Sequence, residues 1–233
     1  MAHSVEILLP AQRYVFALEE GRAVPQPAST SAEGFHSYKR LQAEGKVAGM
    51  IAIPNCCLVR ASEPYVVDPG LIMQGAPVSS SLRARGVEPH TAKVILTHTH
   101  FDHVQALIEF PQREVYVHRI ELDAPYTSFQ QSVLDMVQVV PLEGDEGEIE
   151  PGLRWIRTPG HSQGLMSLLV ETDDGLVVIA SDCVGPLPEY FENMDLPQDF
   201  GPERDELLHQ WQRIRELEPH MVIPGHNPPV VLS

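Results

Sequence analysis

A dense cluster of histidine and aspartate constrains this chain more than any other feature of its sequence. The segment Thr97–His103 reads THTHFDH and has the pattern H-x-H-x-D-H. It overlaps the end of Lys93–Thr97, an apolar run that predicts a buried strand. His98 and His100 are two residues apart, so in extended backbone both point to the same side, while the aspartate and the third histidine turn into the start of a helix. These side-chain types at this spacing predict a metal site at the end of a strand.

Three further ligand-type residues share one context, because each follows a short apolar run that predicts a strand. They are His161 after Leu153–Thr158, Asp182 after Leu176–Ser181, and His226 after Met221–Ile223. Side chains beyond the carboxyl ends of strands converge on one rim of a layered sheet, where α/β folds place their sites. A Pro-Gly pair before His161 and before His226 predicts sharp turns that let the backbone approach closely. We therefore expect these three residues to join the first cluster.

The donor set is five histidines and two aspartates: His98, His100, Asp102, His103, His161, Asp182 and His226. Imidazole and carboxylate without thiolate suit zinc, and also iron, cobalt or manganese. Seven ligands are too many for one tetrahedral ion, but they suit two ions that share one carboxylate, an arrangement used in hydrolysis. A structural zinc site would need only four ligands and would usually be rich in cysteine.

The pattern of strands and helices predicts an α/β fold with layers around one core, in a single domain over residues 1–233. The clearest helix is Pro202–Leu217, in which apolar residues recur at helical spacing. A second helix is expected at Val78–Arg85 and a third at Asp102–Glu109. Two stretches rich in proline and small or polar residues, Glu20–Tyr38 and Cys183–Gly201, are expected to be long surface loops that shape a pocket.

Charge and cysteine content restrict partners and compartment. The chain has 16 basic and 32 acidic side chains, and a formal net charge of -16 disfavours a nucleic-acid partner. Three cysteines, two of them adjacent, make a poor disulfide framework and indicate a reducing compartment. The longest apolar run, near Val47–Ile53, is far shorter than the roughly 20 residues of a membrane span. We therefore expect a soluble, cytoplasmic protein with no membrane partner.

In these motifs the chain resembles the metallo-β-lactamase superfamily, from about Val47 onward. The resemblance implies a four-layer αβ/βα sandwich. It also implies that His98, His100 and His161 hold a first metal ion, that Asp102, His103 and His226 hold a second, and that Asp182 bridges the two. Asp68, in the sequence VDPG, matches an early aspartate of the family that supports the site by hydrogen bonds without binding metal.

Within this superfamily the chain is most similar to the lactonase-like branch, which includes acyl-homoserine lactonases. The similarity lies in TPGH up to His161, in SD up to Asp182, in the aromatic-acidic stretch Glu189–Asn193, and in PGH up to His226. Those lactonases carry a tyrosine three residues after the bridging aspartate, where this chain has Gly185. Tyr190 is the candidate to supply that hydroxyl from a shifted position and so to contact the substrate.

The resemblance implies a binuclear metal-dependent hydrolase that opens a lactone or related ester through a metal-bridging hydroxide. Two divalent ions, with zinc as the first candidate, would lower the pKa of the bridging water and polarise the substrate carbonyl. Asp182 would bridge the ions, and Asp102 would also relay a proton to the leaving group. The alternatives are a glyoxalase II-like thioesterase or a phosphodiesterase on the same site, or an iron-bearing redox or metal-binding protein. Dimers are common in this family, so a homodimer is also expected.

Overall fold

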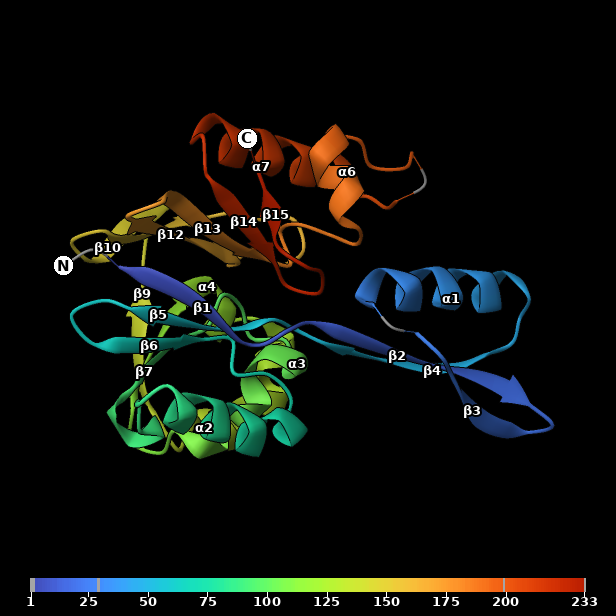
Figure 1. Cartoon of the computed structure of the whole chain (residues 1–233), viewed down its shortest axis with the longest axis horizontal. Coiled ribbons are helices and arrows are strands. Elements are labelled where there is room, and N and C mark those ends of the chain that lie inside the picture. Colours follow the sequence, from blue (N-terminus) through green and yellow to red (C-terminus); the bar gives the residue numbers. More distant parts are fainter. Residues whose placement is uncertain (1–2, 29, 199, 233) are drawn as a thin grey trace.

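Two six-stranded sheets form the middle of the molecule, and each carries helices on its outer face (Figure 1). The computed structural model describes residues 3–28, 30–198 and 200–232. The first sheet contains β1 (Ser4–Leu9), β5 (Cys56–Arg60), β6 (Pro64–Val67), β7 (Lys93–Ile95), β8 (Glu114–His118) and β9 (Gln138–Leu142), in that order. The second contains β10 (Glu146–Glu150), β11 (Leu153–Arg157), β12 (Met166–Thr172), β13 (Gly175–Ser181), β14 (Met221–Pro224) and β15 (Val230–Val231), also in order.

Helices complete the four layers. The α-helices beside the sheets are α2 (Gly75–Ala84), α3 (Phe101–Val104), α4 (Arg119–Leu122), α5 (Gln131–Leu134), α6 (Pro188–Asn193) and α7 (Arg204–Glu216). In Figure 1, α6 and α7 cover the outer face of the second sheet, and α2 lies on the outer side of the first. The αβ/βα sandwich expected from the sequence is confirmed. No helix in the described ranges is long and apolar enough to cross a membrane.

The core between the sheets is built by alternation along the strands. Val59 and Ile95 of the first sheet pack in one cluster with Trp155, Met166 and Leu168 of the second, and each is at most 2% exposed. Side chains on the opposite faces of the strands pack outward, against α2 on one side and against α6 and α7 on the other. Inner strands such as β5, β12 and β13 are buried on both faces and are therefore nearly continuous apolar runs.

The prediction of a long surface loop over Glu20–Tyr38 is wrong. It contains β3 (Arg22–Gln26) and more than half of α1 (Ser31–Ala43), which form an arm with β2 (Gln12–Glu19) and β4 (Val47–Ile53). The arm projects from the sandwich, with α1 on one face of its three-stranded sheet (Figure 1). Leu41 of α1 packs against Val15 and Ala17 of β2. The weak local propensity of this proline- and serine-rich stretch is overridden by packing that is not local in sequence.

Smaller differences have local causes. The expected helix Asp102–Glu109 is a single α-helical turn followed by a 3-10 segment over Gln105–Glu109. The expected loop Cys183–Gly201 contains α6, which has Pro188 at its first turn, a favourable place for proline. Strands β10 and β15 were not expected. They are short edge strands, which carry a weak apolar signal.

The strand directions bring the predicted site residues to one rim. In the first sheet, β6, β7 and β8 run parallel. In the second, β13 and β14 run parallel, and β11 has the same direction because β12 is antiparallel to both β11 and β13. The candidate residues leave the carboxyl ends of these strands: Asp68 after β6, His98 after β7, His161 after β11, Asp182 after β13 and His226 after β14.

Candidate metal centre

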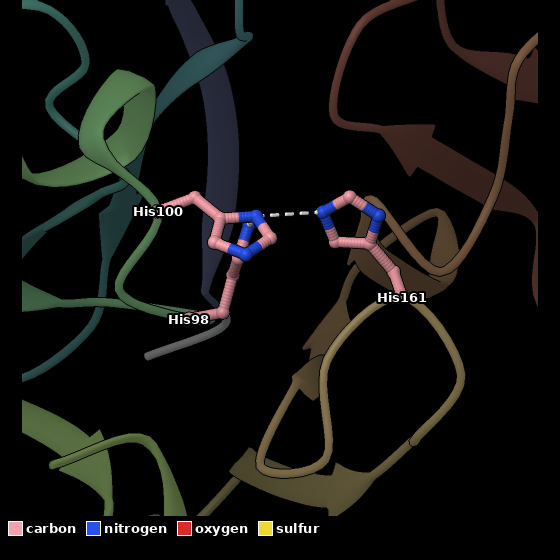
Figure 2. Close-up of side chains that lie close together, drawn as sticks. All are labelled: His98, His100 and His161. Carbon is pink, nitrogen blue, oxygen red and sulfur yellow. Dashed lines mark hydrogen bonds between the residues drawn. The ribbon is translucent and has the colours of Figure 1, made fainter. Parts of the chain in front are cut away.

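The first candidate subsite is made by His98, His100 and His161, whose ligand atoms lie within 4.8 Å of one another. Figure 2 shows the three rings converging from the loop after β7 and the loop after β11. His98 Nε2 lies 3.1 Å from His100 Nδ1, which lies 2.9 Å from His161 Nε2. Two nitrogens bound to one tetrahedral zinc ion at about 2.0–2.1 Å would be roughly 3.3 Å apart. The spacing therefore fits one ion between the three rings.

The second candidate subsite is made by Asp102, His103 and His226. Asp102 Oδ2 lies 3.2 Å from His226 Nε2 and 3.8 Å from His103 Nε2. Asp102 and His103 both belong to α3, at the start of the helix, so consecutive residues supply two of the three donors. His226 reaches them from the other sheet, in the loop after β14.

Asp182 lies between the two subsites. Its Oδ2 is 3.2 Å from His161 Nε2 and 4.0 Å from His98 Nε2 on the first side. On the second side it is 3.6 Å from His103 Nε2 and 3.4 Å from His226 Nε2. One carboxylate oxygen therefore faces nitrogens of both groups.

Gly225 makes room for this carboxylate. A Cβ built on Gly225 would overlap Asp182 Oδ1 and would lie 3.0 Å from its Cγ. The backbone also holds this contact, because the Gly225 N–H donates to the Ser181 carbonyl at 2.8 Å. The Pro-Gly turn expected from the sequence thus serves a close approach to a site residue.

Buried polar atoms without a hydrogen-bond partner indicate whether a metal ion fits this site. Among the described residues, His103 Nε2 and Asp182 Oδ1 are buried and have no hydrogen-bond partner. Such orphaned atoms are costly in a protein interior unless a ligand or ion pairs with them. Burial lowers the pKa of His98 and of His100, which keeps both rings neutral, the state in which imidazole binds metal. Against the effect of burial, Asp182 raises the pKa of His103 and of His226, so positive charge is favoured beside this carboxylate. The donor set therefore fits divalent metal ions.

Asp68 supports the centre from behind the ligands. It is 2% exposed, and its Oδ2 accepts a hydrogen bond from His103 Nδ1 at 3.0 Å. This bond orients the His103 ring so that Nε2 faces the site, as in carboxylate-histidine-metal pairs. Asp68 also accepts from the Thr97 N–H at 2.9 Å, the Thr97 hydroxyl at 2.7 Å and the Ser181 hydroxyl at 2.9 Å. The structure thus places Asp68 where the sequence-based interpretation expected a supporting residue.

Glu121 is a site-supporting residue that sequence reasoning missed. It is fully buried at the start of α4, and its Oε2 accepts from the Thr99 N–H at 3.0 Å and from the Tyr126 hydroxyl at 2.8 Å. Its Oε1 accepts from the Gly164 N–H at 2.9 Å. Thr99 lies between two ligand histidines and Gly164 follows the third, so one carboxylate joins both loops of the first subsite. Nothing in the local sequence distinguishes this glutamate from a surface residue.

Tyr190 lies away from the cavity beside the centre. It is half-buried on α6 and packs against the apolar cluster beneath α7. A cavity of about 170 Å³ adjoins the centre and is lined by Arg13, His161, Asp182, Val184, Gly185, Pro186, Phe200, Glu203, Leu207, His226 and Asn227. Substrate contact by Tyr190 stays a prediction. Gly185, which stands where the lactonases carry their tyrosine, lines the cavity.

A second depression opens beside Asp102. It has a volume of about 400 Å³ and is lined by Met50, Ile51, Ala52, Leu71, Ile72, Met73, Phe101 and Asp102. Ile72 is 61% exposed and Phe101 is 55% exposed, so this apolar surface is open to solvent. The centre therefore lies between a small cavity lined by both charged and apolar residues and an open apolar cleft.

The family model of the metallo-beta-lactamase superfamily matches residues 52–226, which hold all seven ligand candidates. The chain belongs to this superfamily. It is a metal-dependent hydrolase, and its histidine and aspartate side chains form groups that could hold a metal ion. The superfamily resemblance expected from the sequence is confirmed.

Two relatives extend this comparison. The "Probable metallo-hydrolase YflN" of Bacillus subtilis is 26% identical, and the match covers 89% of this chain and 91% of that protein. An N-acyl homoserine lactonase from a Bacillus species is 31% identical over 63% of this chain and 60% of the lactonase. The chain is thus similar to lactonases in its family, over part of their length.

Solved structures agree on the fold. One from Thermotoga maritima is matched over 100% of both chains, with a TM-score of 0.69 and 18% identity. An N-acyl homoserine lactone hydrolase, solved with the product N-hexanoyl-L-homoserine at its catalytic metal centre, covers 97% of this chain. The match spans 94% of that hydrolase, at a TM-score of 0.67 and 21% identity.

Proposed function

We propose that this superfamily member is a binuclear hydrolase that opens a lactone or a related carboxylic ester. The observation that carries the proposal is the position of Asp182 Oδ2, within 4.0 Å of two histidine nitrogens in each subsite. One ion would be held by His98, His100 and His161, a second by Asp102, His103 and His226, and Asp182 would contact both. When bound, two such ions supply an activated water and polarise the ester carbonyl.

The chain's own side chains have distinct parts in this proposal. Asp102 lies at the edge of the apolar cleft, so its carboxylate could accept the proton that the attacking water releases and pass it to the leaving alkoxide. Asp68 and Glu121 fix the ligand loops and do not meet the substrate. The small cavity on the other side limits the bulk that can be placed next to Asp182.

The apolar cleft supports a substrate with an acyl chain. Its exposed lining of Ile72, Met73 and Phe101 would be covered by an aliphatic group whose carbonyl lies at the centre. Burial of each methylene contributes about 0.8 kcal/mol, so rates at low substrate concentration should rise with chain length. Lactonases among the relatives support the same substrate class.

Zinc is the proposed metal, because neutral imidazole with carboxylate and no thiolate suits it; manganese, cobalt and iron suit the same donors. We further propose one domain over residues 1–233, since both sheets share one core. A cytoplasmic location and a homodimer also stay proposals. The three free cysteines are those of a reducing compartment.

The test is acid release from a panel of acyl lactones of increasing chain length, in weak buffer, with zinc-loaded protein. Asp182→Asn is the control variant, with its metal content measured. We expect turnover in the wild type and a loss of most metal and activity in the variant. Wild-type-like turnover in Asp182→Asn would exclude the bridging role. If the metal-loaded wild type releases no acid from any lactone, the substrate class is excluded. The assay would then be repeated with thioesters and phosphodiesters.

A further inference from the structure

Residues from the amino-terminal part of the chain make many of the hydrogen bonds that hold the loop carrying His226. The four carbonyl oxygens from Pro224 to Asn227 each accept a hydrogen bond from Ser31 or Asn55. Asn55 Nδ2 donates to the carbonyls of Pro224 and Asn227, each at 2.7 Å, and its backbone N–H donates to that of Gly225 at 2.6 Å. The Ser31 hydroxyl donates to the His226 carbonyl.

Arg13 joins the same loop to the segment after Asp182. It lies on β2 and is 7% exposed. Its guanidinium donates to Asn227 Oδ1 at 3.2 Å, to the Ser31 carbonyl at 3.1 Å and to the Pro186 carbonyl at 3.3 Å. Asn227 Nδ2 donates to the same Pro186 carbonyl at 2.9 Å. Arg13 therefore connects the arm with both segments that flank the cavity.

A buried arginine here is more than packing. None of the ion pairs found in residues 3–28, 30–198 and 200–232 includes Arg13, and it lines the cavity that His226 and Asp182 also line. An unpaired buried charge is expensive unless its hydrogen bonds are used. Burial lowers its pKa to about 10, against the pull of Asp182, so it stays charged at neutral pH. An apolar residue would cost less at this position if packing were its only role.

These hydrogen bonds to the loop of His226 meet a geometric requirement. Loops with few packed contacts open easily, whereas metal ligands must be held within about 0.5 Å of the productive position. None of the three histidines of the first subsite belongs to this loop, because His98 and His100 follow β7 and His161 follows β11. The loop reaches the first subsite only through Asp182, so weakening the loop should affect the second subsite more than the first.

We propose that Arg13 and Asn55 are positioning residues that hold His226 in place, so that the amino-terminal arm, together with Asn55 where the arm joins β5, controls occupancy of the second metal subsite. The inference rests on the proposed two-subsite centre. It concerns metal binding and not the identity of the substrate, so the two can fail separately.

The experiment measures Zn²⁺ binding to the full-length apoprotein by equilibrium dialysis, with metal counted by mass spectrometry. The variants are Arg13→Met, Arg13→Lys and Asn55→Ala. His226→Ala is the benchmark for loss of the second subsite. Arg22→Met removes an exposed arginine from β3 of the same arm and is the matched control. Circular dichroism and thermal melts establish that each variant is folded.

We expect two ions in the wild type and in Arg22→Met. In Arg13→Met and Asn55→Ala the weaker step should lose affinity by about 10–100-fold, as for other residues that orient metal ligands, while the stronger step should change much less. Lysine should restore only part of the loss, because it lacks the planar fork that reaches three acceptors.

Wild-type affinity for both ions in folded Arg13→Met and Asn55→Ala would overturn the inference. An equal loss at both steps would also overturn it, since that outcome marks a general structural role. If Arg13→Met does not fold, Arg13→Lys and Asn55→Ala decide by the same comparison of the two steps. A wild type that binds two ions and opens no lactone would refute the proposed substrate class and leave this inference standing.

Discussion

Replacing Gly225 with alanine tests the close approach on which the centre depends. The added Cβ would overlap Asp182 Oδ1 and would lie 3.0 Å from its Cγ and 3.1 Å from the Ser181 carbonyl carbon. The backbone of Gly225 is fixed on two sides, because its N–H donates to the Ser181 carbonyl and its carbonyl accepts from the Asn55 N–H. The carboxylate is then the group that moves, by roughly 1 Å, which is the scale of misplacement that costs about 100-fold in rate.

The expected result for Gly225→Ala is a fall in kcat of about 100-fold, equivalent to about 2.7 kcal/mol in the activation barrier. Metal content should fall as well, because Asp182 would leave its position between the subsites. The assays are zinc stoichiometry by mass spectrometry and initial rates on the best lactone of the panel. Gly49→Ala is the matched control, since a Cβ on Gly49 of β4 meets no atom within 4 Å. Full zinc stoichiometry in Gly225→Ala with a rate within threefold of the wild type would refute this reasoning.

Two further outcomes are expected. A Cβ on Gly185 meets no atom within 4 Å, so Gly185→Tyr should place a hydroxyl in the cavity beside Asp182 and raise kcat/KM on acyl-homoserine lactones by about tenfold, the effect of one hydrogen bond to a charged group. An unchanged or lower kcat/KM in a folded, metal-loaded variant would contradict this. Burial raises the pKa of Cys183 to about 12 and raises those of Cys56 and Cys57 as well, so at pH 8 only about one Cys183 in 10,000 is thiolate. Alkylation of the native protein should therefore be slow at pH 8 and become fast for all three thiols in denaturant, and rapid labelling of the folded protein would show that this burial is wrong.

The ligand candidates could be predicted because their signal is local. His98 and His100 belong to one short motif, and His161 and His226 each follow an apolar strand and a Pro-Gly turn. The period of two residues in a strand and the shape of a tight turn depend on neighbouring residues alone. The structure brings the ligand atoms of these side chains into three overlapping groups, each within 4.8 Å. Their roles as metal ligands stay a prediction until metal is measured.

The amino-terminal arm shows where local signals end. Thr30 does cap α1, accepting from the Glu33 N–H at 3.1 Å, but the proline-, serine- and alanine-rich stretch around it reads as loop. One signal was present: Arg13, Val15 and Ala17 alternate along β2 and all three are buried, so an arginine stands at an inward position. A charge on an inward face indicates a buried polar contact, although not its partner.

The sequence by itself determined the donor chemistry, the strand ends that carry it and the layered class of the fold. Tertiary structure alone decided that Glu121 joins two ligand loops and that the arm holds the loop of His226. The physical reason is distance along the chain. Dihedral preferences and periodicity act over a few residues, whereas Arg13 and Asn227 are 214 positions apart, and they meet only after both sheets and the arm have packed.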